Sequence, residues 1–102
     1  MKQIILSHDD KAQIYLVPDP VAEHLSQYCE EFSVHWIWEN PHGHKLLKDI
    51  NGMKIAMYTS WDFIEYLNKW VFPHQPSSLV QQLDWYSYEL PEKYADYPQY
   101  NF

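Results

Sequence analysis

The chain has 102 residues, of which 46% are hydrophobic and 18% are aromatic. Such an apolar composition excludes a disordered chain, and the length suits one domain with a single hydrophobic core. We therefore expect a single domain over residues 1–102, in which residues 91–102 form an aromatic C-terminal tail.

The charge balance is strongly acidic, with 14 acidic residues against 7 basic ones and a net charge of −7. Every basic residue is a lysine, so the chain lacks the planar guanidinium that grips phosphate and carboxylate groups at two points. The net charge also repels polyanions. These features argue against direct nucleic-acid binding and against an enzyme that clamps phosphorylated substrates. Most of the acidic residues lie in the two ends of the chain, whereas residues 41–73 are nearly neutral.

Cysteine usage and hydropathy point to the cytoplasm. The single cysteine, Cys29, excludes an internal disulfide and fits a reducing compartment. The apolar run Ile4–Leu6 is too short for a signal peptide, and no stretch approaches the roughly 20 apolar residues of a membrane span. We expect a cytoplasmic protein that does not enter a membrane.

The first 40 residues predict a hairpin and then a helix. Gln3–Ser7 and Gln13–Val17 are β-rich runs joined by a polar turn, and the first alternates poorly, as a strand covered on both faces would. Asp19 suits an N-cap and Pro20 suits the first helical position. A helix to about residue 38 is expected, because apolar residues then recur at three- and four-residue spacing: Val21, Leu25, Tyr28, Cys29, Phe32 and Trp36.

A second hairpin is expected around Asn51-Gly52, the dipeptide that type I′ turns favour. Its arms would be Lys45–Ile50 and Met53–Thr59. An alternative makes His44–Ile50 a short helix that ends at Gly52. The hairpin predicts one buried face, because three apolar residues alternate along its second arm: Met53, Ile55 and Met57.

A second helix is expected to follow, with Ser60 as its cap and Asp62 in its first turn. Glu65 and Lys69 stand at the i,i+4 spacing of an ion pair, and Pro73 ends the helix. The apolar stripe that this helix would bury consists of Phe63, Ile64, Leu67, Trp70 and Val71.

The last third gives weaker patterns. Leu79–Leu83 is interpreted as a short helix, Trp85–Leu90 as a strand, Pro91–Asp96 as one helical turn, and Tyr97–Phe102 as an irregular tail. The expected fold class is α+β, a small single domain in the order β-β-α-β-β-α with an aromatic C-terminal extension. Its two main helices would cover one face of an antiparallel sheet.

Candidate catalytic and metal-ligating residues are few. His42 and His44 share a loop, and a polar turn holds His8-Asp9-Asp10, but two histidines do not specify a metal site and no known metal or nucleophile motif is present. Glu31 and His35 stand i,i+4, which is more typical of a surface ion pair than of an acid–base pair. We predict no catalytic residue, no metal and no cofactor. An enzyme or metal-binding domain that uses these histidines and aspartates is kept as the alternative.

The aromatic surplus near the C-terminus favours a protein-binding function. Tyrosine and tryptophan are enriched at interfaces, and an acidic, aromatic surface suits a basic partner. The competing interpretation is that this segment covers the sheet. The leading hypothesis is a small acidic module that covers a basic surface of a partner protein, as an inhibitor, immunity-type or antitoxin-type protein does. A homo-oligomeric structural protein, such as a homodimer, is a further alternative. The predicted partner-binding residues are Trp85, Tyr86, Tyr88, Glu89, Glu92, Tyr94, Asp96, Tyr97 and Tyr100.

Overall fold

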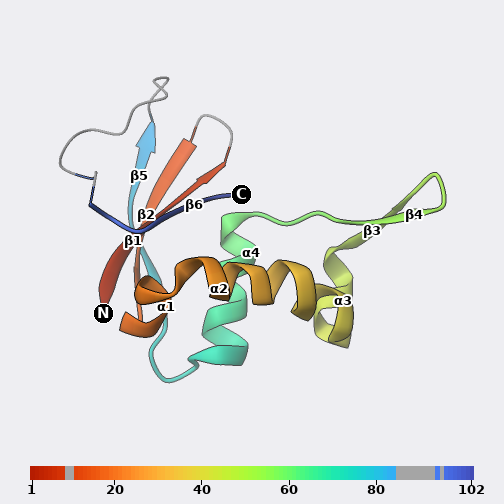
Figure 1. Cartoon of the computed structure of the whole chain (residues 1–102), viewed down its shortest axis with the longest axis horizontal. Coiled ribbons are helices and arrows are strands. Elements are labelled where there is room, and N and C mark those ends of the chain that lie inside the picture. The colour runs from red at the N-terminus through yellow and green to blue at the C-terminus, as the bar shows by residue number, and fades with distance from the viewer. Residues whose placement is uncertain (9–10, 85–93, 95) are drawn as a thin grey trace.

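A computed structural model describes residues 1–8, 11–84, 94 and 96–102 (Figure 1). The chain forms a small α+β domain, as predicted. Four strands make one mixed sheet in the order β5-β2-β1-β6, and two strands, β3 and β4, make a separate sheet. The helices pack against one face of the larger sheet (Figure 1).

The N-terminal hairpin is confirmed. Strand β1 (Lys2–His8) pairs antiparallel with β2 (Lys11–Val17) over the full length of both. Ile4, Ile5 and Leu6 are all buried, because successive side chains point to opposite faces and both faces are covered. Ile4 and Leu6 belong to the core under the helices, and Ile5 belongs to a smaller cluster on the other face.

The C-terminal third completes this sheet and corrects two predictions. Strand β5 (Ser78–Asp84) pairs with β2, so the helix predicted over Leu79–Leu83 is wrong. Strand β6 (Gln99–Asn101) pairs parallel with β1, so the predicted irregular tail is wrong there. In both places, pairing with an existing strand overrides weak local preference. The strand predicted for residues 85–90 and most of the helical turn predicted for residues 91–96 lie outside the described residues.

One long helical segment follows the first hairpin, and it runs to residue 39, one residue beyond the prediction. It comprises α1 (Asp19–Glu23), α2 (Leu25–Glu30), a π-helix over Glu31–Trp36, and α3 (Ile37–Glu39). The predicted helix is interrupted at His24, whose φ of −131° and ψ of 44° are not helical.

The start of the long helix differs from the prediction. The N-cap is Pro18 and no side chain caps the helix; Asp19 instead binds the N-terminal amine at 2.9 Å. This hydrogen bond lowers the pKa of the Asp19 carboxyl.

The π-helix explains how the long helix keeps one buried side. In a π-helix the hydrogen bonds run from i to i+5, which places residues five apart on the same side. Phe32 and Ile37 are five residues apart, and both are fully buried. An uninterrupted α-helix would turn one of them away from the core, because it repeats every 3.6 residues.

A 3₁₀ helix over Pro41–Leu46 connects the long helix to the second hairpin. Asn40 caps it by accepting a hydrogen bond from the backbone N–H of His42 at 2.9 Å. Gly43 is buried where the 3₁₀ helix crosses α3. A Cβ atom at Gly43 would lie 2.7 Å from the Cα atom of Ile37 and 2.7 Å from the carbonyl oxygen of Trp36.

The second hairpin is confirmed, with corrected limits. Strand β3 (Leu47–Ile50) pairs with β4 (Met53–Ala56), and positive φ angles of 54° at Asn51 and 82° at Gly52 fit the predicted type I′ turn. The alternative helix over residues 44–50 is confirmed only as far as Leu46. We call residues 47–57 the arm, because they project from the body of the domain (Figure 1).

The predicted burial of one face of the arm is wrong. Met53, Ile55 and Met57 are all exposed. The arm forms its own two-stranded sheet, so the layer that would cover this face is absent from the described part of the chain.

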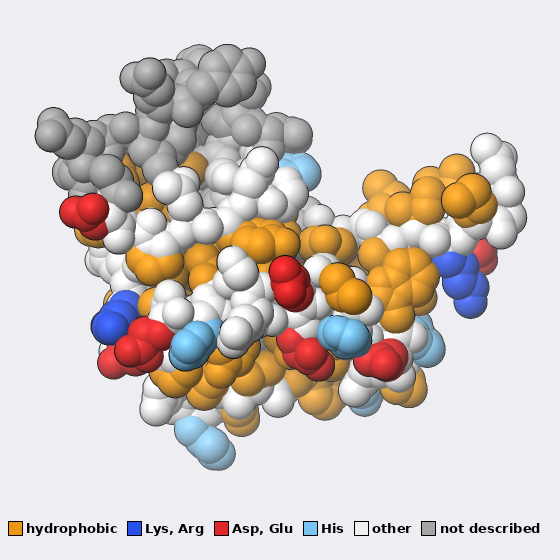
Figure 2. Space-filling model, viewed as in Figure 1, with side chains coloured by type: hydrophobic (Ala, Val, Ile, Leu, Met, Phe, Trp, Pro, Cys, Tyr) orange, Lys and Arg blue, Asp and Glu red, His pale blue; other side chains and the backbone are white. Residues whose placement is uncertain are grey.

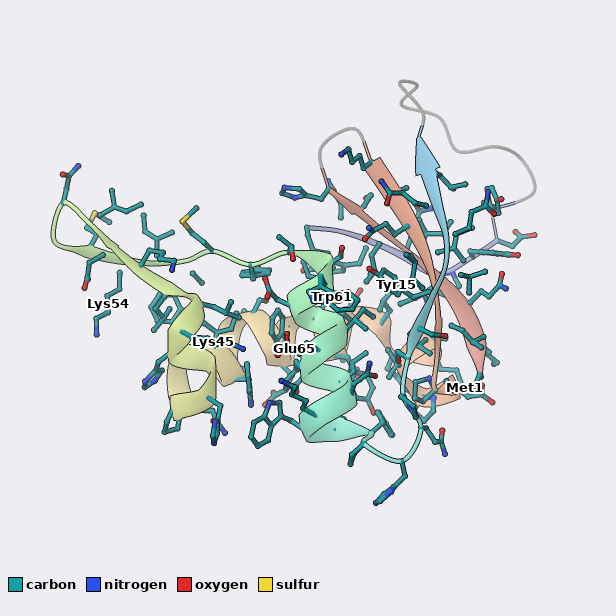
Figure 3. All side chains as sticks on the ribbon, turned by 180° about the vertical axis from the view of Figure 1, so that it is seen from behind. Met1, Tyr15, Lys45, Lys54, Trp61 and Glu65 are labelled. Carbon is teal, nitrogen blue, oxygen red and sulfur yellow. The ribbon has the colours of Figure 1, made fainter. Side chains whose placement is uncertain are left out.

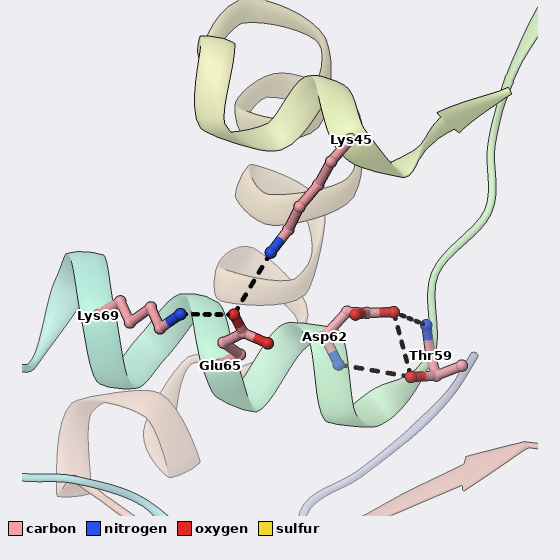
Figure 4. A network of polar contacts seen from close by, with 5 residues as sticks. All are labelled: Lys45, Thr59, Asp62, Glu65 and Lys69. Carbon is pink, nitrogen blue, oxygen red and sulfur yellow. Dashed lines mark hydrogen bonds and ion pairs between the residues drawn. The ribbon is translucent and has the colours of Figure 1, made fainter.

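Helix α4 (Ser60–Tyr66) continues as a second π-helix over Leu67–Val71. Its cap is Thr59 rather than Ser60: Thr59 and Asp62 form a reciprocal capping box (Figure 4). Ser60 instead donates a hydrogen bond to Gln13 on β2 at 2.7 Å. This bond ties the start of α4 to the sheet.

The outer side of α4 carries the predicted ion pair and one further partner. The Glu65 carboxylate accepts from Lys69 Nζ at 2.8 Å and from Lys45 Nζ, in the 3₁₀ helix, at 3.4 Å (Figure 4). These hydrogen bonds, the Lys69 bond above all, lower the pKa of Glu65. Of the predicted stripe, Phe63, Ile64 and Leu67 are buried, whereas Trp70 is exposed and Val71 is half-buried.

Replacing Gly43 by alanine should destabilise the domain, because the new methyl group would clash with the backbone of the long helix. We expect a loss of about 2 kcal/mol in the free energy of unfolding, measured by urea denaturation. Gly52→Ala is the matched control. Nothing lies within 4 Å of its Cβ position, so it carries only the cost of a positive φ angle, about 1 kcal/mol. Equal stability of Gly43→Ala and the unaltered chain would contradict the close packing of these helices.

Candidate protein-binding surfaces

The predicted partner-binding residues fall into two groups. Trp85, Tyr86, Tyr88, Glu89 and Glu92 lie outside the described residues. The other four differ in exposure. Tyr94 is only 5% exposed and Asp96 is exposed, whereas Tyr97 and Tyr100 are half-buried.

The described part of the tail is packed against the sheet. Tyr94 and Tyr97 contact each other at a ring distance of 5.5 Å and cover the sheet face opposite the helices. Burial raises the pKa of Tyr100, whose ring contacts Phe102 at 5.2 Å. These tyrosines therefore offer a partner less surface than the sequence implied, and their role in binding stays a prediction.

A different surface holds an exposed tryptophan on the same side of a helix as exposed carboxylates. On the outer side of the long helix, Val34 is 59% exposed and Trp38 is 41% exposed. Exposed residues recur there every four positions, and they include Glu30, Glu31 and Glu39. We call these five residues the helix patch. Figure 2 shows acidic side chains and histidines spread along this side of the molecule.

Trp38 is held in position by its neighbours. Its indole Nε1–H donates to the carbonyl oxygen of Ser33 at 3.1 Å, and the His44 ring nitrogen Nε2 lies 3.0 Å from the Trp38 carbonyl oxygen. Trp38 also lines a groove of about 340 Å³, whose other wall is formed by the arm residues Leu47, Lys48, Asp49 and Lys54, with His44 between them. Such fixed, partly exposed tryptophans are typical of the residues that dominate binding energy at interfaces.

The arm presents the second exposed surface. The pairs Ile50–Met53 and Lys48–Ile55 lie opposite each other across the two strands, and Met57 continues the ladder through its N–H bond to the Leu46 carbonyl at 2.8 Å. Because opposed residues share a face and faces alternate along a strand, four apolar side chains lie on one face. We call Ile50, Met53, Ile55 and Met57 the arm face; they are 40% to 66% exposed.

A polar cluster lies where the sheet meets α4. Gln13 Oε1 accepts hydrogen bonds from the Tyr15 hydroxyl at 2.9 Å and from the Ser60 hydroxyl at 2.7 Å. A pocket of about 190 Å³ opens beside it, with Lys11 and Trp61 among its lining residues. Figure 3 labels Tyr15, which belongs to β2, and Trp61, which belongs to α4. The cluster is satisfied internally, so we interpret it as structural.

The histidines that could have marked a metal site serve other contacts. The His42 ring packs on Trp70 with ring centres 4.3 Å apart, His44 contacts Trp38, and His35 pairs with Glu39 at 3.6 Å. No group of three metal-ligating side chains occurs among the described residues, of which Asp9 and Asp10 are not part.

Burial accounts for the two largest pKa shifts. Cys29 is a free, fully buried thiol, as predicted, and desolvation raises its pKa to about 12. Desolvation likewise raises the pKa of the Tyr66 phenol to about 12. Neither group is a nucleophile or a base at neutral pH.

Sequence patterns indicated each of the two exposed surfaces, although neither surface was predicted to bind a partner. Val34 and Trp38 fall between the positions of the buried stripe, so they could have been placed outside the core. The arm face was recognised as an apolar alternation and assigned to the core, since alternation shows which residues share a face and not what covers that face.

Comparisons with known proteins add no further constraint: no family model matches the chain, and neither a curated protein nor a solved structure matches it. Within the part of the chain that the structure describes, no helix has the length and apolar character needed to cross a membrane.

Alkaline pH should destabilise the domain through these buried groups. Folding raises the pKa of Cys29 from 9.0 and that of Tyr66 from 10.0, in each case to about 12. The unfolded chain therefore ionises first, and the stabilisation is complete below about pH 9 and is lost between pH 9 and 12. For Tyr66 we expect a loss of about 1 kcal/mol at pH 11 relative to pH 8, measured by urea denaturation.

The variant Tyr66→Phe is the control, because it keeps the ring and removes the ionisable hydroxyl. Its stability should fall less than that of the unaltered chain between pH 8 and pH 11. An equal fall in both proteins would show that Tyr66 does not titrate late.

Proposed function

We propose that this chain is a small acidic protein-binding module that covers a basic surface of a partner protein with its helix patch. The observation that carries the proposal is that Trp38, which is exposed and held by hydrogen bonds, shares the outer side of the long helix with three exposed carboxylates. An apolar anchor at the centre and charges at the rim are the arrangement in which a few residues supply most of the binding energy.

The acidic residues of the helix patch indicate that the partner has a basic surface. Glu30, Glu31 and Glu39 give the helix patch a negative charge, and the whole chain carries −7. The charge of the helix patch and the net charge of the chain both speed the approach of a basic protein and oppose that of an acidic one. The same charge, with no arginine in the chain, disfavours direct binding to nucleic acid. An inhibitor, immunity-type or antitoxin-type role fits the size and charge.

The local backbone supports this choice of surface. Glu31 and Val34 lie within the π-helix, and π-helical turns occur frequently at functional sites. A reducing, cytoplasmic setting is part of the proposal, since Cys29 is a free thiol. An enzymatic function has less support, because the histidines proposed for it contact aromatic residues and main-chain groups.

The proposal is tested by affinity capture from a native lysate, followed by binding measurements with the purified captured protein. Trp38→Ala should weaken binding by about 30-fold, the loss typical of a central interface residue. The double variant Glu30→Gln/Glu31→Gln should slow association and reduce its dependence on salt.

Trp61→Ala is the matched control, because Trp61 is an exposed tryptophan outside the helix patch. It should leave the affinity unchanged. The proposal is wrong if the captured protein has an acidic surface, or if it binds Trp38→Ala as tightly as the unaltered chain.

A further inference from the structure

The arm is a separate structural unit with little support from the body. It is a two-stranded sheet that shares no strand with the larger sheet, and it extends away from the helices (Figures 1 and 3). A two-stranded hairpin alone is at best marginally stable in water, and further strands or a packed face are needed to stabilise it.

The two faces of the arm have different chemistry. Asp49 and Lys54 lie opposite each other on one face, which also holds Leu47 and borders the groove beside Trp38. The arm face on the other side is apolar except for Lys48. Figure 2 shows hydrophobic side chains gathered along one side of the arm and charged ones along the other.

The exposed apolar side chains of the arm face mark it as a contact surface for another protein molecule. Met53 is 66% exposed and Met57 is 54% exposed, and Ile50 and Ile55 lie beside them. Contiguous exposed apolar side chains usually mark a contact surface. Because the helix patch borders the opposite face of the arm, the protein proposed to bind there would leave the arm face uncovered.

Charge indicates which protein covers the arm face. Residues 47–56 contain Lys48, Lys54 and Asp49 and so carry a formal charge of +1, which leaves −8 for the rest of the chain. A basic protein would meet Lys48 at the arm face. A second copy of this chain brings a strongly acidic body, which attracts the arm. The arm is thus the part of this acidic molecule where a second copy meets the least repulsion.

We propose that two copies of the chain dimerise through their arms, with the two arm faces packed against each other about a twofold axis. The four apolar side chains of the arm face can pack on the same four side chains of a second copy, as a twofold interface requires, while Lys48 lies beside Ile55 in each copy. Two arms packed in this way cover the eight apolar side chains that the isolated arms expose. The contact is smaller than the roughly 800 Å² per partner of a standard interface, so the dimer dissociates at low concentration.

Sedimentation velocity over a concentration range of about 1–500 μM, chosen for a contact below standard size, tests the proposal without any other protein. The mass of the unaltered chain should rise from the monomer value of 12.4 kDa towards twice that value. The double variant Met53→Glu/Ile55→Glu should remain monomeric throughout. Far-UV circular dichroism should show that its helices are retained, since both side chains are exposed.

The matched control is Leu79→Glu/Val80→Glu, which places the same charges on two apolar residues of β5 that are each 48% exposed. It should dimerise as the unaltered chain does. A chain that is monomeric at every concentration would overturn the proposal, as would a dimer that the arm substitutions leave intact.

Cysteine cross-linking gives a second measurement that does not depend on the glutamate variants. Ile55→Cys places a thiol at the centre of the arm face, and the buried Cys29 does not compete. Under mild oxidation it should give a disulfide-linked dimer, and Leu79→Cys should not. Absence of the Ile55→Cys cross-link would contradict arm-to-arm packing. Because the helix patch is unchanged in every arm variant, failure of the dimer leaves the proposed function standing. Unchanged binding by Trp38→Ala would overturn the proposed function and leaves the dimer standing.

Discussion

The aromatic ring of Phe32 joins the parts of this domain. It is fully buried and contacts Phe63 and Tyr66 on the second helical segment at ring distances of 5.6 and 5.1 Å. It also contacts Tyr58, directly after the arm, at 5.4 Å. Phe63 in turn contacts Phe102, directly after β6, at 5.8 Å. Residues far apart in the sequence thus meet around one side chain, and the loss of a large buried ring costs about 3–5 kcal/mol in typical cores. The position of the arm and of the helix patch depends on this packing.

The two π-helices follow from the same constraint. Phe32 and Ile37 can both face the core only if the helix rotates by a smaller angle per residue between them than an α-helix does. The second π-helix, Leu67–Val71, lies in the segment that packs against the first, where Trp36 contacts Tyr66 at 4.9 Å and Trp70 at 6.2 Å. On the outer side of the first helix, the π-helix also sets the positions of Val34 and Trp38.

The sequence was enough to predict the structures that neighbouring residues determine, such as turns. It was not enough to predict which distant segments pair or which residues cover each face. Asn51-Gly52 specified its turn because only a few residues tolerate positive φ angles, and the run around Ile5 indicated a strand covered on both faces. By contrast, β5 was missed because its partner, β2, lies more than 60 positions earlier in the chain. The cap was misplaced by one residue, since Thr59 and Ser60 are equally good candidates by type and only the geometry of Asp62 distinguishes them. The fold class required only local patterns, whereas the candidate surfaces required knowledge of what each face packs against.

The arm shows why the surfaces could not be found by pattern alone. An alternation such as Met53, Ile55 and Met57 means that a strand has one apolar face, and in most domains the core of the same chain covers that face. Here the body ends at the 3₁₀ helix, so the face projects beyond any layer that the described residues provide. In the proposed dimer, the apolar face of the arm supplies the attraction, and the lysines of the arm offset part of the repulsion between two acidic chains. The nearly neutral middle third of the sequence, which looked purely structural, therefore holds the surface proposed for self-association, while the acidic long helix holds the surface proposed for a basic partner.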